Sequence, residues 1–268
     1  ATDSTNITSW NSDGFALGSG SVNESSRTYV SWNWKANGSG SLNEVGSIDS
    51  TVSANTTSGF SIVSYTGNST SGATVGHGLG AVPSMIIWKN LGTDSWGVYH
   101  KSLGNTHAMF LDLTNASTSF STLVNNTTPS SSLITLGSST NSNNSGGMIA
   151  YCFSEVKGYS KFNLYTGNGS ATDGTFVYTG FKPAFVIYKN TTQADSWFIH
   201  DNKRQGYNPE NELLFADLNN AESTVNRIDL FSNGFKATDS DKGVNASGNN
   251  YIYMAFAENP FVTSTGVP

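Results

Sequence analysis

Two short groups of residues combine a carboxylate, an indole ring and an imidazole at nearly the same spacing. Their members are Asp94, Trp96 and His100 in the first group, and Asp195, Trp197 and His200 in the second. An exposed Trp ring stacks well on the apolar face of a sugar, while Asp and His side chains hydrogen-bond to sugar hydroxyls. These six residues are therefore the candidate ligand-binding residues. In the competing interpretation each Trp belongs to the core, Asp-Ser forms the turn before it, and the His is a satisfied strand residue.

The acidic residues offer little support for catalysis. Asp112 resembles Asp217, and Glu155 resembles Glu258, only as copies of one repeated position. Glycoside hydrolysis needs two carboxylates that face one substrate, and copies in different repeats need not meet. We therefore expect no catalytic residues and no enzymatic activity. A glycan-degrading tailspike enzyme, with carboxylates converging from distant loops, is the less favoured alternative.

No residue pattern indicates a metal or cofactor site. The four His and the single Cys are too scattered for zinc. The glycines around His77 lack phosphate-loop spacing, and Asp239-Ser240-Asp241 lacks the EF-hand spacing for calcium. We expect no metal and no cofactor. Cys152 lies in an apolar run, where we expect a buried small hydrophobe rather than a reactive thiol.

The charge and hydropathy patterns exclude several partners. The formal net charge is −6, and no block of Lys or Arg suggests phosphate binding, so we expect no nucleic acid partner. No apolar run approaches the roughly 20 residues of a membrane helix, and no signal peptide is recognisable. Charged residues make up only 12% of the chain, and Ser, Thr, Asn and Gly replace them. Such a composition suits strands and tight turns.

An internal repeat organises the sequence. Tyr65-Thr66-Gly67-Asn68 returns one hundred residues later as Tyr165-Thr166-Gly167-Asn168, and Pro83 returns as Pro183. The Asp-Ser-Trp strings follow in the same order, and we align His100 with His200. The resulting divisions are 1–36, the C-terminal part of an incomplete repeat; 37–57, a Gly/Ser/Thr-rich connector; 58–157 and 158–261, two full repeats; and 262–268, a tail.

Short apolar runs separated by turn residues predict the fold class. In the first full repeat they cover residues 60–65, 84–89, 96–101, 108–113, 133–136 and 148–156. This spacing predicts an all-β chain of tandem antiparallel β-sandwich units, jelly-roll or immunoglobulin-like, of about 100 residues each. A helical turn is expected only near residues 208–214. The last run alternates, which predicts that Trp34, Phe153 and Phe256 are equivalent, core-facing residues.

Several strings resemble a known family. Residues 29–36, 51–55, 65–68, 75–80, 151–155 and 251–258 resemble a domain of unknown function found in marine bacteriophage tail-fibre-like and virion structural proteins. The resemblance implies a phage tail fibre or surface appendage, located at the virion surface, with other virion subunits as partners. It implies no catalytic residues. Binding of a host-surface glycan fits a distal position, and the alternative is a capsid decoration or assembly subunit without a ligand.

The N-terminal partial repeat predicts self-association. Its large apolar residues lack the strands that cover their counterparts in the full repeats; they are Trp10, Phe15, Val30, Trp32 and Trp34. Exposed strand edges and apolar faces are unstable in water. We therefore expect this segment to pack against another chain or domain, and the protein to be a homo-oligomer, a trimer by analogy with fibres. In the alternative, the segment folds back onto residues 58–157.

Overall fold

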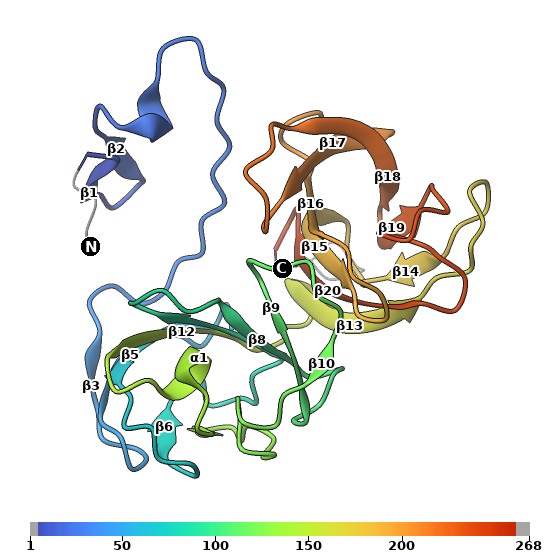
Figure 1. Ribbon diagram of the computed structural model, residues 1–268. Helices are drawn as coiled ribbons and strands as arrows, with labels where there is room; N and C mark the ends of the chain where they lie inside the picture. Colours follow the sequence, from blue (N-terminus) through green and yellow to red (C-terminus); the bar gives the residue numbers. More distant parts are fainter. Residues whose placement is uncertain (1–4, 261–268) are drawn as a thin grey trace. The chain divides into compact units, whose positions relative to one another are not determined.

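The computed structural model describes residues 5–260, and the chain divides into two compact units, residues 1–34 and 35–268 (Figure 1). The smaller unit contains a hairpin of β1, Ile7–Trp10, and β2, Phe15–Leu17, followed by one 3-10 turn at Ser21–Asn23. Residues 29–34 form no strand, so the expected counterpart of the last repeat strand was wrong. In the full repeats that strand lies between two others, and residues 5–34 of the smaller unit contain no copies of them.

The larger unit begins with the sheet of the first repeat. Its strands, in chain order, are β3 Ser41–Asn43, β4 Ser50–Asn55, β5 Phe60–Thr66, β7 Met85–Asn90, β8 Gly97–His100, β9 His107–Phe110, β10 Thr118–Ser119 and β12 Gly147–Phe153. Their order in space is β10-β9-β8-β7-β12-β5-β4-β3, with every neighbour antiparallel. A separate pair, β6 Thr74–Gly76 and β11 Leu133–Thr135, and the short helix α1, Thr140–Asn143, complete the repeat.

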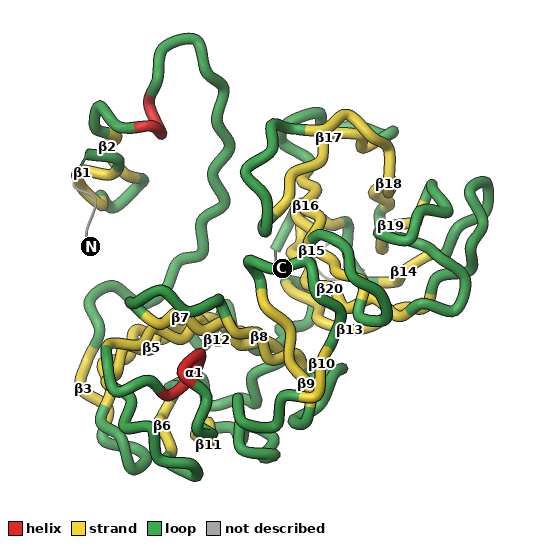
Figure 2. The backbone as a smooth tube through the Cα atoms, viewed as in Figure 1, coloured by secondary structure: helices red, strands yellow, loops and turns green. Residues whose placement is uncertain are grey.

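The second repeat shares the order of six strands with the first. Its strands are β13 Ser160–Thr166, β14 Phe176–Tyr178, β15 Pro183–Asn190, β16 Trp197–Asp201, β17 Glu210–Phe215, β18 Ser223–Phe231, β19 Gly234–Ala237 and β20 Asn250–Ala257. They form one sheet in the order β13-β20-β15-β16-β17-β18-β19-β14, which curves into a nearly closed, barrel-like form (Figure 2). The shared part, β13-β20-β15-β16-β17-β18, corresponds to β5-β12-β7-β8-β9-β10. Antiparallel strands dominate throughout, so the expectation of an all-β, sandwich-type fold is confirmed.

Two local expectations differ from the structure. The segment that we expected to form only a connector, residues 37–57, contributes β3 and β4 to the first sheet. Its Ser50 and Ser53 are buried and hydrogen-bonded, so a polar composition did not prevent strand formation. The helical turn expected at 208–214 was also wrong, because β17 occupies Glu210–Phe215 and pairs with β18. The Asn208 side chain donates to and accepts from the main chain of Leu230 at 2.9 Å, extending that pairing.

Each repeat has its own hydrophobic core, on the face that we did not expect. On β12 the core cluster contains Met148, Ala150 and Cys152, while Ile149 and Tyr151 are only partly buried on the opposite face. On β20 it likewise contains Tyr251, Tyr253 and Ala255. The alternation of residues along these strands was therefore predicted correctly. Of the two alternating sets, however, we assigned the core to the wrong one. Among the larger residues, Phe153 and Phe256 are buried and pack against each other across the two repeats, whereas Trp34 is only partly buried.

Candidate functional site

The two Asp-Ser-Trp groups occupy the same place in the two repeats. Trp96 directly precedes β8, and Trp197 begins β16. The main-chain N–H of Trp96 donates to Oδ1 of Asp112 at 3.0 Å, and that of Trp197 donates to Oδ1 of Asp217 at 2.8 Å. Both carboxylates therefore have the same structural role, which is to hold the start of the Trp-bearing strand.

The two His residues are not equivalent, and our alignment of them was wrong. On β8, Val98 pairs with Ile87 and His100 with Met85. On β16, Ile199 pairs with Ile187 and His200 with Val186. Since Met85 corresponds to Phe185, His100 corresponds to Asp201 and His200 to Tyr99. A shift of one residue along a strand moves a side chain to the other face of the sheet, so the two imidazoles lie on opposite faces.

His100 connects the two repeats. The ring is completely buried, Nδ1 accepts from the main-chain N–H of Ser102 at 3.2 Å, and Nε2 lies 3.3 Å from the carbonyl oxygen of Tyr253 in β20. This geometry assigns the proton to Nε2, which donates to the carbonyl. Burial lowers the pKa of His100 to about 4. The side chain is therefore a neutral internal hydrogen-bonding group.

His200 lies in the core of the second repeat. Its ring stacks on Tyr188 with centroids 5.8 Å apart, and Nε2 is 3.3 Å from the Tyr188 hydroxyl. Burial lowers the pKa of His200 to about 3, and the Arg204 guanidinium adds to this effect. The imidazole is thus enclosed by core aromatics and does not reach the surface.

Trp197 and its neighbours are covered by the first repeat. The Trp197 side chain is buried, and Nε1 donates to the carbonyl oxygen of Phe110 at 2.8 Å. Lys189, its neighbour across the strands, is also buried and donates from Nζ to the carbonyl of Thr114 at 3.3 Å. Burial lowers the pKa of Lys189 to about 8. The main-chain N–H of Asp195 donates to the same Thr114 carbonyl at 2.9 Å.

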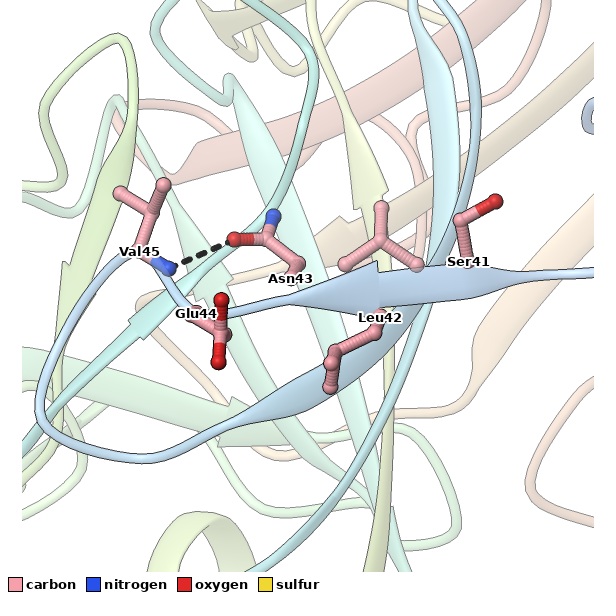
Figure 3. A pocket seen from close by; sticks show the side chains of 6 residues that line it. Ser41, Leu42, Asn43, Glu44 and Val45 are labelled. Carbon is pink, nitrogen blue, oxygen red and sulfur yellow. Dashed lines mark hydrogen bonds between the residues drawn. The ribbon is translucent and has the colours of Figure 1, made fainter.

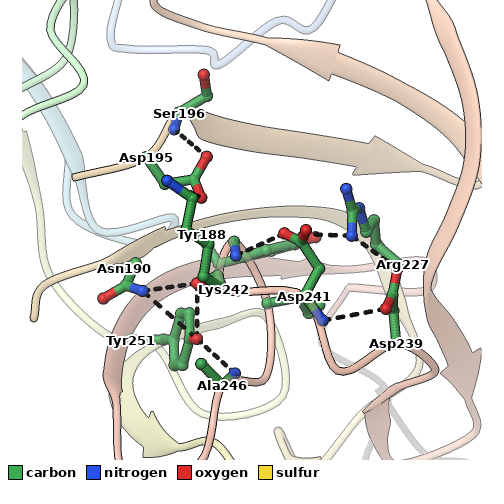
Figure 4. A network of polar contacts seen from close by, with 12 residues as sticks. Tyr188, Asn190, Asp195, Ser196, Arg227, Asp239, Asp241, Lys242, Ala246 and Tyr251 are labelled. Atoms are coloured by element: carbon green, nitrogen blue, oxygen red, sulfur yellow. Dashed lines mark hydrogen bonds and ion pairs between the residues drawn. The ribbon is translucent and has the colours of Figure 1, made fainter. Parts of the chain in front are cut away.

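A polar network lies beside Asp195 in the second repeat (Figure 4). Lys242 Nζ approaches Oδ2 of Asp195 at 3.7 Å, and the Lys242 carbonyl accepts from Tyr251 Oη at 2.8 Å. Arg227 Nη1 pairs with Asp239 Oδ2 at 2.6 Å and with Asp241 Oδ1 at 3.2 Å. The two carboxylates considered for calcium therefore both pair with one arginine.

The first group is more accessible than the second. The Trp96 ring is partly exposed and stacks with Tyr151 at a centroid distance of 6.4 Å. Lys89 Nζ lies 5.6 Å from the centre of the Trp96 ring and donates to the Asp94 carbonyl at 2.7 Å. The Asp94 carboxylate accepts from Asn90 Nδ2 at 2.6 Å. Of the six predicted ligand-binding residues, Asp94 and Trp96 thus form the surface-accessible pair, and the structure does not bring all six together.

A shallow surface pocket of about 500 Å³ lies elsewhere, around β3 and β4 (Figure 3). Leu42 and Val45 line it and are 69% and 51% exposed. The Asn43 side chain faces the main chain there and accepts from the N–H of Val45 at 2.8 Å. The pocket brings no catalytic pair together, and none of the six predicted residues lines it.

Sequence reasoning missed two buried asparagines that fix the repeats internally. Asn143 and Asn245 are completely buried. Each accepts through Oδ1 from the main-chain N–H after the Tyr-Thr-Gly string, that of Asn68 or Asn168, at 2.9 Å. Asn143 lies four residues before its strand begins at Gly147, whereas Asn245 lies five before Asn250. A gapped alignment would have matched them.

The described residues, 5–260, show no group of three or more His, Cys, Asp or Glu side chains placed to hold a metal ion. In the same range, no helix is long and apolar enough to cross a membrane.

The sequence matches the family of a domain of unknown function, DUF7483, over residues 1–260, and the chain belongs to this family. Comparison with curated proteins and with solved structures finds no match.

Proposed function

We propose that this member of the family is a structural protein of a bacteriophage virion, part of a tail fibre or surface appendage. The observation that carries the proposal is the continuous packing of one repeat on the next. The Trp197 indole reaches back to Phe110, the buried Lys189 to Thr114, and His100 to Tyr253. Such interlocked β repeats suit a rigid extended element, because each repeat buries part of its neighbour.

The chemistry of the candidate residues agrees with a structural role. Asp112 and Asp217 hold main-chain N–H groups, and Arg227 is shared by Asp239 and Asp241. Glu155 is bound by Lys101 at 2.7 Å and by Lys161 at 2.8 Å. These two cations lower the pKa of Glu155 although its partial burial acts in the opposite direction. A carboxylate held ionised by two lysines is poorly suited to donate a proton, which supports a structural role for Glu155 rather than a general-acid role.

Binding of a host-surface glycan is the narrower proposal, and Trp96 is the residue that supports it. Its partly exposed ring and the adjacent Asp94 offer a stacking surface and polar groups. Glycan-array binding that is lost in Trp96→Ala, but kept in a Trp197→Phe control that folds normally, would support this role. If both variants retain glycan binding equally, a role for Trp96 in binding is excluded.

Labelling the chain in purified particles tests the main proposal. Antibodies against the 268-residue chain should decorate virions in electron micrographs, at the distal part of a fibre. Decoration over the capsid lattice would favour a decoration subunit instead, and particles that lack the chain altogether would overturn the proposal. Sedimentation velocity on the isolated chain tests the proposed homo-oligomer, for which the fibre analogy favours a trimer.

A further inference from the structure

At the contact between the two repeats, a connecting segment of the first repeat covers one face of the second. The connection between β9 and β10, residues 110–117, covers the face of the second repeat that carries Lys189 and Trp197. Four hydrogen bonds hold it there: Trp197 Nε1 to Phe110 O at 2.8 Å, Asp195 N to Thr114 O at 2.9 Å, Lys189 Nζ to Thr114 O at 3.3 Å, and Ser117 N to Thr191 O at 3.0 Å.

The first repeat presents the same face without this cover. We name it the Trp96 face, and it consists of Lys89, Leu91, Asp94 and Trp96, the counterparts of Lys189, Thr191, Asp195 and Trp197. Within the described part of the chain, Trp96 Nε1 has no hydrogen-bond acceptor. Lys89 Nζ turns to the Asp94 carbonyl, where Lys189 reaches the other repeat. Leu91 is 60% exposed, although it is a large apolar residue.

The second repeat contains a counterpart of the covering segment, and within the described chain this counterpart covers no other repeat. Residues 215–222 connect β17 to β18 as residues 110–117 connect β9 to β10. The N–H of Ala216 donates to Trp197 O at 3.1 Å, just as the N–H of Leu111 donates to Trp96 O at 3.0 Å. Leu218 and the three residues after it are exposed, and the last of them, Ala221, differs in this from its counterpart Ala116, which is partly buried in the first repeat. The carbonyl of Asn219, the counterpart of Thr114, accepts no hydrogen bond from residues 5–260.

We propose that residues 215–222 of one copy of this chain bind the Trp96 face of a second copy, as residues 110–117 bind the second repeat. The occupied interface within the chain shows what fits this face: main-chain carbonyls that accept from the indole and the lysine. Because the binding segment and the bound face lie on different repeats, the contact is heterologous. Each added copy therefore leaves one segment and one face open, and the series extends as a filament or closes as a ring.

Single substitutions at exposed positions test the contact in the full chain. Leu91→Glu alters the Trp96 face, and Ala221→Glu alters the binding segment. Leu91 and Ala221 are exposed, so both changes leave the cores intact, and Ala116, the counterpart of Ala221, is partly buried in the occupied interface. Leu42→Glu is the matched control, since Leu42 is 69% exposed on β3, outside both surfaces. In sedimentation velocity over a concentration series, wild type and Leu42→Glu should associate. Either of the other variants should weaken association at least about tenfold.

Mixing the two defective variants gives the decisive result. Each retains one functional surface, so an equimolar mixture should form 1:1 dimers and nothing larger. A two-fold symmetric contact would not be restored by mixing, and that result would overturn the proposal. A wild-type chain that stays monomeric at every concentration would also overturn it, as would equal loss in Leu42→Glu. None of these results depends on whether the protein belongs to a virion, so the proposed function is tested separately. A Trp96 face bound by a second copy is closed to glycan, so within a filament only the terminal copy with an open face could bind glycan through Trp96.

Discussion

The indole N–H of Trp197 donates across the repeat boundary to the main-chain carbonyl of Phe110, at 2.8 Å, while the equivalent Trp96 has no such acceptor within residues 5–260. The same residue type at the same register therefore has two environments. In the second repeat it is part of an interface, and in the first it lies at the surface.

This difference predicts unequal costs for the same substitution. Trp197→Phe removes a buried hydrogen bond and part of the ring, so the free energy of unfolding should fall by about 1–3 kcal/mol. Trp96→Phe should cost less than about 0.5 kcal/mol, because its N–H has no protein acceptor to lose. Urea denaturation of both variants measures the two values, and equal costs would contradict the structural difference.

The ring pair Phe153 and Phe256 provides a second test. Both side chains are buried, and their centroids lie 6.2 Å apart across the two repeats. Replacing either with Ala should lower the free energy of unfolding by about 3–5 kcal/mol, since a large cavity remains. Tyr207→Ala is the control, because Tyr207 is 70% exposed and its loss should change stability by less than about 0.5 kcal/mol. If Phe153→Ala lowers the free energy of unfolding no more than Tyr207→Ala does, the interface is not packed in solution.

His200 predicts a pH dependence with a definite sign. Its pKa is lowered from 6.5 to about 3 in the folded state, mainly by burial, so the unfolded chain binds the proton first as pH falls. Stability due to neutral His200 is therefore complete above pH 6.5 and is lost progressively as pH falls toward 3. At about pH 5 the loss from this group should be about 2 kcal/mol.

His200→Phe tests this sign, because Phe does not titrate and the first repeat has Tyr99 at the same register. Relative to wild type, the variant should gain about 2 kcal/mol of stability between about pH 7.5 and pH 5. Denaturant unfolding at the two pH values gives the difference. If the difference in the free energy of unfolding between variant and wild type is the same at both pH values, His200 is protonated in the folded state or its environment opens in acid.

The expected absence of hydrolysis can be tested directly. Incubation of the chain with host capsule or exopolysaccharide should release no oligosaccharides, as measured by reducing-end assay and mass spectrometry. If release occurs, Glu155→Gln and Glu258→Gln should identify whether these carboxylates take part. Release that depends on either one would show that its ion pairs do not prevent catalysis.

Most of the fold could be predicted because the sequence carries two independent signals. The apolar runs at 60–65, 84–89 and 148–156 coincide with β5, β7 and β12, and the repeat transfers that prediction to the second half. Strands β3 and β4 could not be found, because their residues are small and polar and join the sheet through main-chain bonds. The β17 segment was predicted as a helical turn because it follows Pro209, whereas in the structure it pairs with the next strand, β18.

The candidate site was harder to predict, because register and burial decide it. His100 and His200 look equivalent in the sequence because each follows an Asp-Ser-Trp string. Their spacing from that string, however, differs by one residue. That single residue places them on opposite faces. The sequence also could not show that Trp197 is covered by residues from the other repeat, since this depends on how the two sheets pack.

Strands β4 and β13 show how differently the two sheets end. In the first repeat, β4 pairs along the whole outer edge of β5. Only residues 154–159 separate β12 from β13, which leaves no room for such an added strand, and within the described chain β13 pairs with β20 alone. Open strand edges promote aggregation unless a charge opposes it. Lys161 supplies that charge on β13, held at 2.8 Å from Glu155, and any strand adding there would have to dehydrate the ion pair. Lys161, which lies outside the core cluster, therefore opposes edge-to-edge pairing at this end of the second sheet.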